Sequence, residues 1–281
     1  MPEGSFASSG PITAEDALQR SLAAFNRERF DPALPTVDWR SGVERMAEGL
    51  REEGEFLEER RAAVSARAAE APTDADSFVR WFEALENDGP GQHDPLFPWL
   101  ATEATAEQMC WFLTQEVAGE AGFEDLSAIT QVKLPVQAKL EIARNYWDEM
   151  GRGNPKGMHG PLLEALAHHM GLDPRPETTV WESLALANVM AGLASNRRYA
   201  YHSVGALGVI EQTAPSRAAL VGKGLKRLGV PAGFRHYFDL HAVLDVKHSA
   251  AWNAEAIHPL VVSDPSLAPA IAEGALMRLE C

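Results

Sequence analysis

Three side chains that can bind a metal ion lie close together in the last third of the sequence: His241, Asp245 and His248. On an α-helix their spacing places all three on one stripe, which also carries Leu244 and Trp252 and is therefore expected to face the core. Two imidazoles and a carboxylate on a buried stripe are costly unless they are paired or bound. This ligand set suits iron, manganese or zinc. The structural alternative is that Asp245 holds one histidine while the other caps a backbone group.

Further acids and one further histidine occur in three other segments that are expected to be helical. Glu149 stands in the last turn of its segment, where the helix dipole disfavours a carboxylate unless a cation compensates it. His159 follows ten residues later, across a Gly-rich turn, and Glu211 follows an uncharged run rich in Gly and Ala. Glu116 and Glu120 are one helical turn apart, and one of them is expected to point inward. Taken singly, each acid could equally be solvated, and His159 could be a packing residue.

The elements that must position these side chains all have helical periodicity, and no sustained alternation predicts a strand. Helices are expected over about 41–70, 74–86, 105–119, 135–150, 178–196, 197–212, 216–228 and 234–257. Thr13 is expected to cap an earlier helix, Pro215 to separate the two helices that flank it, and Pro259 to end the last one. The sequence therefore predicts an all-α protein, with an N-terminal extension over residues 1–40 and one helical domain over 41–281.

Composition excludes several classes of function. The chain has 281 residues, with 25 Lys and Arg against 40 Asp and Glu, for a net charge of −15. This charge argues against a nucleic-acid binder and against a polybasic membrane anchor. Cys110 and Cys281 form neither a disulfide framework nor a zinc cluster, which favours the reducing cytoplasm. The N-terminus lacks the features of a signal peptide, and the uncharged run over 183–196 is too short to span a membrane.

Four helices that each supply an acid, a histidine or both follow the logic of a helix-bundle dimetal carboxylate site. The ferritin-like version of that site needs a Glu-x-x-His motif on two helices. Only Glu255 and His258 have this spacing, and no second pair matches them. The ferritin-like pattern is therefore not fulfilled.

The order of the motifs resembles the haem-oxygenase-like diiron oxidases and oxygenases, over about residues 90–260. The matching motifs are Glu149-x9-His159, then Glu211 after an apolar helix, then His241-x3-Asp245-x2-His248. In that family these positions ligate two irons, together with one Glu from an earlier helix. Glu116 matches that Glu best by position, and Glu120 is the alternative.

The resemblance implies a haem-oxygenase-like bundle of about seven helices that binds two iron ions, Fe(II)/Fe(III), without haem. It also implies O2 as co-substrate and a small-molecule substrate, which would undergo N-oxygenation of an amine or amino-acid-like group, oxidative C–C cleavage or decarboxylation. Arg197 and Tyr201 share a helical stripe with Glu211 and could bind a substrate carboxylate, although a surface salt bridge of Arg197 is the simpler interpretation. A homodimer is possible.

Three alternatives stay open at this point. A haem-binding protein of the same fold would need only one axial histidine and would leave the other acids and histidines unexplained. A thiaminase-like member would use a nucleophilic cysteine, for which Cys110 is the only internal candidate. The third alternative is a helical scaffold that binds metal without catalysis.

Overall fold

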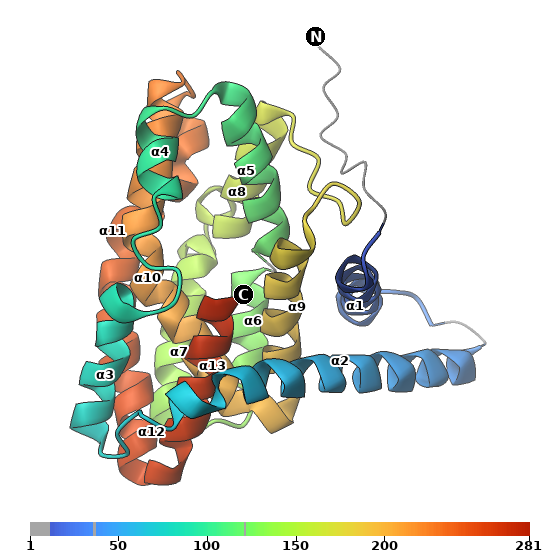
Figure 1. Ribbon diagram of the computed structural model, residues 1–281, viewed down its shortest axis with the longest axis vertical. Coiled ribbons are helices and arrows are strands. Elements are labelled where there is room, and N and C mark those ends of the chain that lie inside the picture. The colour runs from blue at the N-terminus through green and yellow to red at the C-terminus, as the bar shows by residue number, and fades with distance from the viewer. Residues whose placement is uncertain (1–11, 36–37, 121) are drawn as a thin grey trace.

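The computed structural model describes residues 12–35, 38–120 and 122–281, and their regular structure is entirely helical (Figure 1). The all-α prediction is therefore confirmed over these residues. The α-helices are α1 (Ala14–Phe30), α2 (Trp39–Ala68), α3 (Ala75–Asp88), α4 (Leu96–Thr102), α5 (Ala106–Gly119), α6 (Phe123–Thr130), α7 (Val136–Glu149), α8 (His159–Met170), α9 (Trp181–Ser195), α10 (Ala200–Arg227), α11 (Ala232–Trp252), α12 (His258–Ser263) and α13 (Ala268–Glu280). Short 3-10 turns include Arg197–Tyr199, and a π-helical segment, Asn253–Ile257, joins α11 to α12.

The long helix α10 forms the centre of the bundle and packs against α11, α13 and α4. Two glycines allow the backbones of α10 and α13 to approach closely. A Cβ atom on Gly205 would lie 1.9 Å from the carbonyl oxygen of Ile271, and one on Gly274 would lie 1.9 Å from that of His202. Because no side chain fits at either position, this contact fixes how the two helices cross.

Both prolines that were expected to end helices lie inside helical segments. Pro215 is within α10, which continues to Arg227, so the prediction of two separate helices over 197–212 and 216–228 is wrong. Packing on several neighbouring helices along its length outweighs the hydrogen bond that Pro215 cannot donate. Pro259 directly follows the π-helical segment Asn253–Ile257, and the chain stays helical beyond it to Ser263, so the prediction that Pro259 ends the helix is wrong. Helix α13 was also not foreseen.

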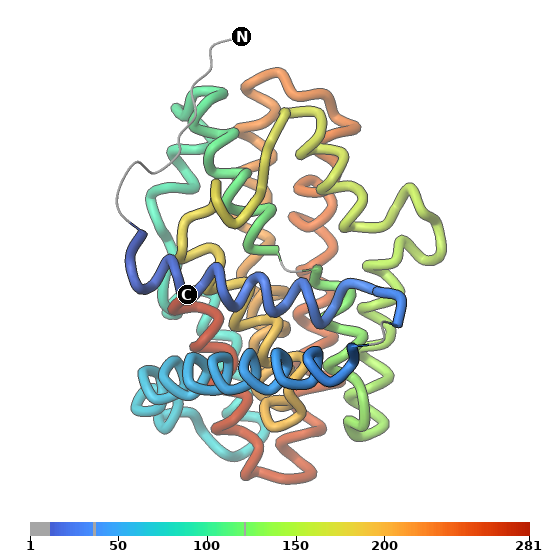
Figure 2. Tube along the Cα trace, turned by 90° about the vertical axis from the view of Figure 1, so that its right-hand side faces the viewer, coloured from blue at the N-terminus to red at the C-terminus, as the bar shows by residue number. Residues whose placement is uncertain are grey.

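The N-terminal helices lie across one side of the bundle. Thr13 caps α1 as expected, because its hydroxyl accepts the N–H of Asp16 at 3.1 Å. Figure 1 shows the first half of α2 projecting beyond the bundle, and Figure 2 shows α1 lying alongside it. A buried ion pair, 2.5 Å between Arg29 and Glu53, joins the two helices. The division of the chain at residue 40 stays a prediction, and α2 begins one residue before it.

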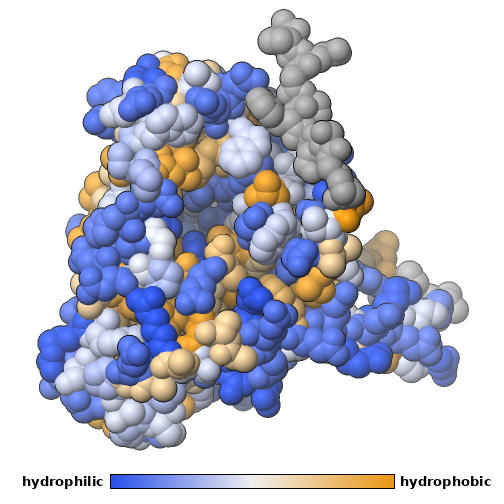
Figure 3. Space-filling model, viewed as in Figure 1, coloured by the Kyte–Doolittle hydropathy of each residue, from blue (hydrophilic) through white to orange (hydrophobic). Residues whose placement is uncertain are grey.

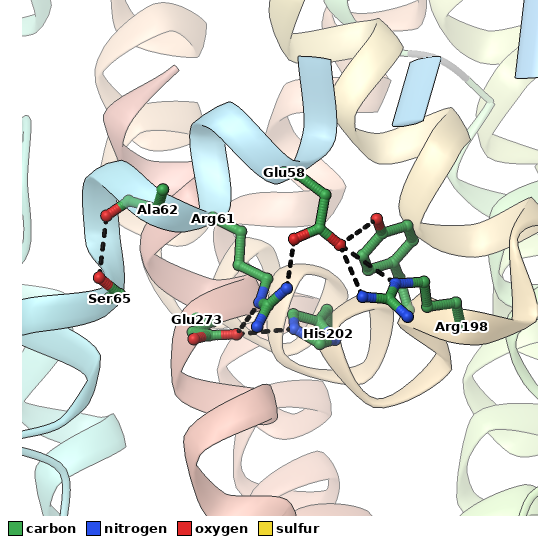
Figure 4. Close-up of polar contacts among 8 residues, drawn as sticks. Glu58, Arg61, Ala62, Ser65, Arg198, His202 and Glu273 are labelled. Atoms are coloured by element: carbon green, nitrogen blue, oxygen red, sulfur yellow. Dashed lines mark hydrogen bonds and ion pairs between the residues drawn. The ribbon is translucent and has the colours of Figure 1, made fainter. Parts of the chain in front are cut away.

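The second half of α2 is tied to the bundle by a polar network (Figure 4). The carboxylate of Glu58 accepts the hydroxyl of Tyr199 at 2.7 Å and pairs with Arg61. Arg61 also pairs with Glu273 of α13 at 2.9 Å, and His202 of α10 lies 2.9 Å from the same Glu273 oxygen. The network therefore joins three helices. None of the described helices is both long and apolar enough to cross a membrane.

Candidate metal centre

Five of the predicted ligands form two groups that have one residue in common. Glu149, His159 and His241 make one group, and Glu149, Glu211 and His248 make the other. Within each group, one potential ligand atom from every residue lies within 4.8 Å of the others. These residues come from α7, α8, α10 and α11. Two neighbouring metal positions that share Glu149 fit this arrangement.

The turn between α7 and α8 brings Glu149 against His159. Helix α7 ends at Glu149, and His159 is the first residue of α8. Between them, Gly151 has a φ of 59°, and a Cβ atom there would lie 2.4 Å from the carbonyl carbon of Gly157. Only glycine allows so tight a return of the chain. As a result the Nδ1 atom of His159 lies 2.5 Å from a carboxylate oxygen of Glu149.

The imidazole of His241 is oriented by the backbone of its own helix. Its Nδ1 atom lies 2.7 Å from the carbonyl oxygen of Tyr237, which can only accept a hydrogen bond. The proton therefore belongs on Nδ1, and the lone pair of Nε2 points toward His159, whose Nδ1 atom is 3.1 Å away. A second ring nitrogen held by a carbonyl is typical of histidines that bind metals.

His248 is held in a similar way by a carboxylate. Its Nε2 atom donates to Asp148 at 3.2 Å, which leaves Nδ1 facing Glu211 at 3.4 Å and Asp245 at 3.9 Å. The other oxygen of Glu211 accepts the side-chain N–H of Asn145 at 2.5 Å. Asp148 and Asn145 thus fix the orientation of two potential ligands without belonging to either group. The sequence analysis did not single out these two residues.

Three buried polar atoms at this point have no hydrogen-bond partner among the described residues. They are Oε2 of Glu211, Oδ1 of Asp245 and Nδ1 of His248. Each such atom costs free energy when it is buried without a partner. A cation in the group of Glu149, Glu211 and His248 would satisfy two of these atoms, and Asp245, which belongs to neither group, lies 3.9 Å from Nδ1 of His248. Carboxylate with imidazole is a ligand set suited to iron. The residues that are present therefore fit a metal ion.

The ionisation of the site also indicates a need for positive charge. Burial raises the pKa of Glu149 well above its ordinary value, and the neighbouring Glu211 raises it further. Burial, followed by the charges of Glu211 and Glu149, raises the pKa of Asp245 to about 10. Burial lowers the pKa of His159 and of His241 to about 4, so both imidazoles are neutral at pH 7. Burial also lowers the pKa of His248, but its contacts with Glu211 and Asp148 outweigh burial and raise the pKa to about 9. His159 and His241 are therefore ready to bind a metal ion, whereas Glu149, Asp245 and His248 would each release a proton when a metal binds.

Glu116 and Glu120, the two candidates for the remaining acid, have different electrostatic neighbours. Burial raises the pKa of Glu120 to about 8, and the charges of Glu116 and Glu149 add to the effect. Burial also raises the pKa of Glu116, but Arg278 and Arg217 oppose this increase. The charge of Glu120 therefore interacts with that of the potential ligand Glu149, whereas the charge of Glu116 interacts with Arg278 and Arg217. Which of them binds a metal stays a prediction.

A third acid, Glu124 of α6, lies at the same site and was missed by the sequence analysis. A Cβ atom on Gly160 would lie 2.6 Å from the Oε1 atom of Glu124, so the missing side chain leaves space for this carboxylate beside His159. The charge of Glu124 also raises the pKa of Glu149. Its spacing of four residues from Glu120 was the only signal in the sequence.

A cavity of about 430 Å³ extends from the potential ligands to Arg217 and Arg278. Its lining includes Glu149, Glu211, His241 and Asp245 as well as Arg217 and Arg278. The rest of the lining is mainly apolar and includes Phe97, Phe112, Phe123, Leu186, Met190 and Ile210. Figure 3 shows a recess with apolar residues near the middle of this face of the molecule. A small organic molecule could occupy this space.

The family model of iron-containing redox enzymes matches residues 110–281. The chain belongs to this family. The match covers well over half of the protein and includes every residue of the two groups that share Glu149. It also confirms the haem-oxygenase-like bundle that the motifs imply. A search among curated proteins found no match.

In this iron-containing redox enzyme, Arg197 and Tyr201 lie away from the cavity. The guanidinium of Arg197 donates to the carbonyl oxygens of Ile129, Thr130 and Val132 at the end of α6, the second of these at 3.2 Å. Tyr201 packs at the edge of the main apolar core. Arg197 also precedes α10, so it does not share a continuous helical stripe with Glu211.

Two other candidates also lie outside the metal centre of this iron-containing redox enzyme. Burial raises the pKa of the Cys110 thiol, which is opposite to the shift that a nucleophilic cysteine needs. His258 is partly exposed and pairs with Asp76 at 3.0 Å. The single Glu-x-x-His motif therefore has no part in either group.

Proposed function

We propose that the protein is an O2-dependent non-haem diiron oxidase or oxygenase that acts on a small metabolite. The observation that carries this proposal is the pair of three-residue groups that share Glu149. A carboxylate has two oxygens and can serve two metal ions at once.

In this proposal one iron is held by Glu149, His159 and His241, and the other by Glu149, Glu211 and His248. Asp245 and one acid of the Glu116, Glu120 and Glu124 series complete the set. When bound, the two Fe(II)/Fe(III) ions would supply electrons for the reduction of O2 and accept electrons from the substrate as it is oxidised.

The chain's own residues prepare the site for that chemistry. The carbonyl of Tyr237 and the carboxylate of Asp148 hold the imidazoles of His241 and His248 in fixed tautomers. Asn145 holds one oxygen of Glu211 and leaves the other free. The mainly apolar lining of the cavity favours an apolar part of a substrate beside the potential ligands.

The reaction belongs to one of three types: N-oxygenation of an amine or amino-acid-like substrate, oxidative C–C cleavage, or decarboxylation. The cytoplasmic location and the possible homodimer stay predictions from the sequence.

The test is anaerobic reconstitution with Fe(II), followed by exposure to O2 with a panel of amino acids, amines and fatty acids. We expect about two irons per chain and O2 consumption that depends on one member of the panel. Glu149→Gln should lower the iron content at both positions, whereas the control His258→Ala should leave it unchanged. Haem binding with no iron uptake would contradict the proposal. Iron uptake without any substrate-dependent O2 consumption would instead support a non-catalytic metal-binding protein.

A further inference from the structure

Two arginines from different helices line the cavity beyond the potential metal ligands. Arg278 of α13 has a buried Nε atom with no hydrogen-bond partner among the residues that the structure describes. Arg217 of α10 donates to the carbonyl oxygen of Gly91 at 3.0 Å, and its guanidinium lies 5.1 Å from the ring centre of Phe97. A guanidinium has five N–H donors, so both side chains retain donors that can serve a ligand.

Neither arginine has a close acidic partner in the described part of the chain. No ion pair within 4.0 Å involves Arg217 or Arg278, and Glu116 acts on both only at longer range. Asp94, the other acid that acts on Arg217, is exposed, and its carboxylate accepts the N–H of Leu96 at 2.8 Å. Burial lowers the pKa of both arginines, and the charge of Arg217 lowers that of Arg278 further.

The position of the pair along α10 separates it from the metal ligands. Arg217 follows Glu211 by six residues, which corresponds to about 9 Å along a helix. The cavity that both arginines line also reaches the potential ligands, and the rest of its lining is mainly apolar. A molecule bound to the arginines by one end would therefore present its other end to the potential metal ligands.

We propose that Arg217 and Arg278 bind the carboxylate of the substrate, and that the substrate is a carboxylic acid whose apolar part extends toward the metal ligands. This inference rests on the proposed function, because it names the substrate class of the same cavity. The two guanidinium groups line the same cavity and repel one another, and a carboxylate bound to both offsets that repulsion.

The two ends of the substrate have different roles in this arrangement. The carboxylate is held remote from the metal ions, so it is a recognition group and the reacting atom lies elsewhere in the molecule. Charge-assisted hydrogen bonds from Arg to a carboxylate contribute about 1.5–3 kcal/mol each. Loss of one arginine should therefore weaken binding of the carboxylate about 10- to 100-fold.

The test measures binding of octanoate, octanamide, octylamine and octyl phosphate by calorimetry, in both the metal-free and the iron-loaded protein. We expect octanoate to bind most tightly, and to bind in both forms. Arg278→Met and Arg217→Met should weaken octanoate binding about 10- to 100-fold and leave octanamide binding unchanged. Arg197→Met is the matched control outside the cavity and should change neither. Arg278→Lys, which retains the charge but not the fork of donors, should have an intermediate effect.

Several outcomes would overturn this inference while leaving the proposed function intact. Octanoate binding that needs iron would place the carboxylate on the metal, and tighter binding of octyl phosphate or octylamine would change the ligand class. Equal affinity of the wild type and both methionine variants would remove the arginines from recognition. If the protein takes up no iron but octanoate binding still depends on both arginines, the proposed function fails and the carboxylate site stands. Thermal unfolding of each variant checks that its fold is retained.

Discussion

At the scale of single residues, the centre is built from side chains that have one polar atom fixed and another left free. His241 uses Nδ1 for a backbone carbonyl, His248 uses Nε2 for Asp148, and Glu211 uses one oxygen for Asn145. The free Nε2 atom of His241 faces His159 in one group, and the free atoms of His248 and Glu211 face each other in the other group. Because one end of each ligand is already fixed, less conformational entropy is lost when a metal binds. The free atoms are buried without a partner, and this costs free energy until a metal binds them.

The first prediction concerns the link between His248 and metal binding. In the metal-free protein, His248→Ala should cost about 1–3 kcal/mol, because it removes the hydrogen bond to Asp148 and the imidazole that faces Glu211. With Fe(II) present at about 100 times its dissociation constant, the wild type should gain about 2.7 kcal/mol. The variant should gain much less.

Anaerobic thermal unfolding with and without Fe(II) measures both effects. His258→Ala is the control, since His258 lies outside the site and pairs with the exposed Asp76. An equal loss of stability by His248→Ala in both conditions, with unchanged iron content, would show a purely structural role for this histidine.

The second prediction separates the three acids that precede Glu149. Glu120→Gln and Glu124→Gln should weaken iron binding about 10- to 100-fold. Both carboxylates lie close enough to Glu149 for the charges to shift the pKa of one or the other group. Glu116→Gln should have a smaller effect, because its charge is opposed by Arg278 and Arg217. Equilibrium titration with Fe(II) under anaerobic conditions measures the difference. The largest effect at Glu116 would restore the assignment that its sequence position favours.

At the scale of elements, the close approach of α10 and α13 places the arginine of each helix in the same cavity. The third prediction tests that approach. Gly274→Ala should destabilise the protein by about 1–3 kcal/mol, because the added methyl group would meet the backbone of His202. Gly54→Ala in α2 is the matched control, since a Cβ atom there meets nothing within 4 Å.

For the control, we expect a gain of about 0.5–1 kcal/mol from the better helix propensity of alanine. Chemical denaturation of both variants provides the measurement. A neutral Gly274→Ala would mean that the two helices can move apart at little cost.

The fourth prediction concerns the pH dependence of the contact between α2 and the bundle. The hydrogen bond from Tyr199, together with Arg198 and Arg61, lowers the pKa of Glu58 below its ordinary value of 4.5. A carboxyl group with a lowered folded-state pKa stabilises the protein above its unfolded-state pKa, and this contribution is lost as the pH falls through the folded value. Glu58→Gln should therefore be less stable than the wild type at pH 7, and the difference should shrink as the pH falls below 4.5.

Unfolding midpoints of the two proteins between pH 3 and pH 8 would show this convergence. Glu59→Gln, on the same turn of α2, is the control. A difference that stays constant over the whole range would mean that the ionisation of Glu58 plays no part in holding α2.

At the scale of the whole molecule, α1 and α2 are attached to the catalytic bundle through buried polar contacts as well as apolar ones. The side chain of Glu53 is 2 % exposed and that of Arg29 is 8 % exposed. Glu53 also lies against Gly192 of α9, where a Cβ atom would come within 3.1 Å of its carboxylate. This ion pair therefore lies where the N-terminal helices meet the bundle.

The fifth prediction is that Arg29→Met destabilises the whole chain by about 3–5 kcal/mol, because it leaves Glu53 buried without a partner. The double variant Arg29→Met/Glu53→Leu should recover most of this loss. Burial raises the pKa of Glu53, so the single variant should be less destabilised at pH 5 than at pH 8, where the carboxyl is charged. Urea unfolding at both values checks this, and a neutral Arg29→Met would show that α1 is not held by this pair.

The sequence by itself determined the fold class, and it predicted the five residues that form the two groups together with Glu116 and Asp245, which belong to neither group. The stripe of His241, Asp245 and His248 follows from the period of the helix, which fixes the relative directions of side chains within one element. The pairing of Glu149 with His159 follows from a short Gly-rich turn. These relations are local, so they can be obtained from spacing alone.

Only the tertiary structure decided which faces of different helices meet. It made Glu149 common to both groups, placed Asp148 and Asn145 behind the ligands, and brought Arg217 and Arg278 into one cavity. These residues are far apart in the chain, and their proximity depends on how closely the helices pack. That packing is the sum of many small contacts and of positions such as the glycines between α10 and α13, where the absence of a side chain allows two backbones to touch.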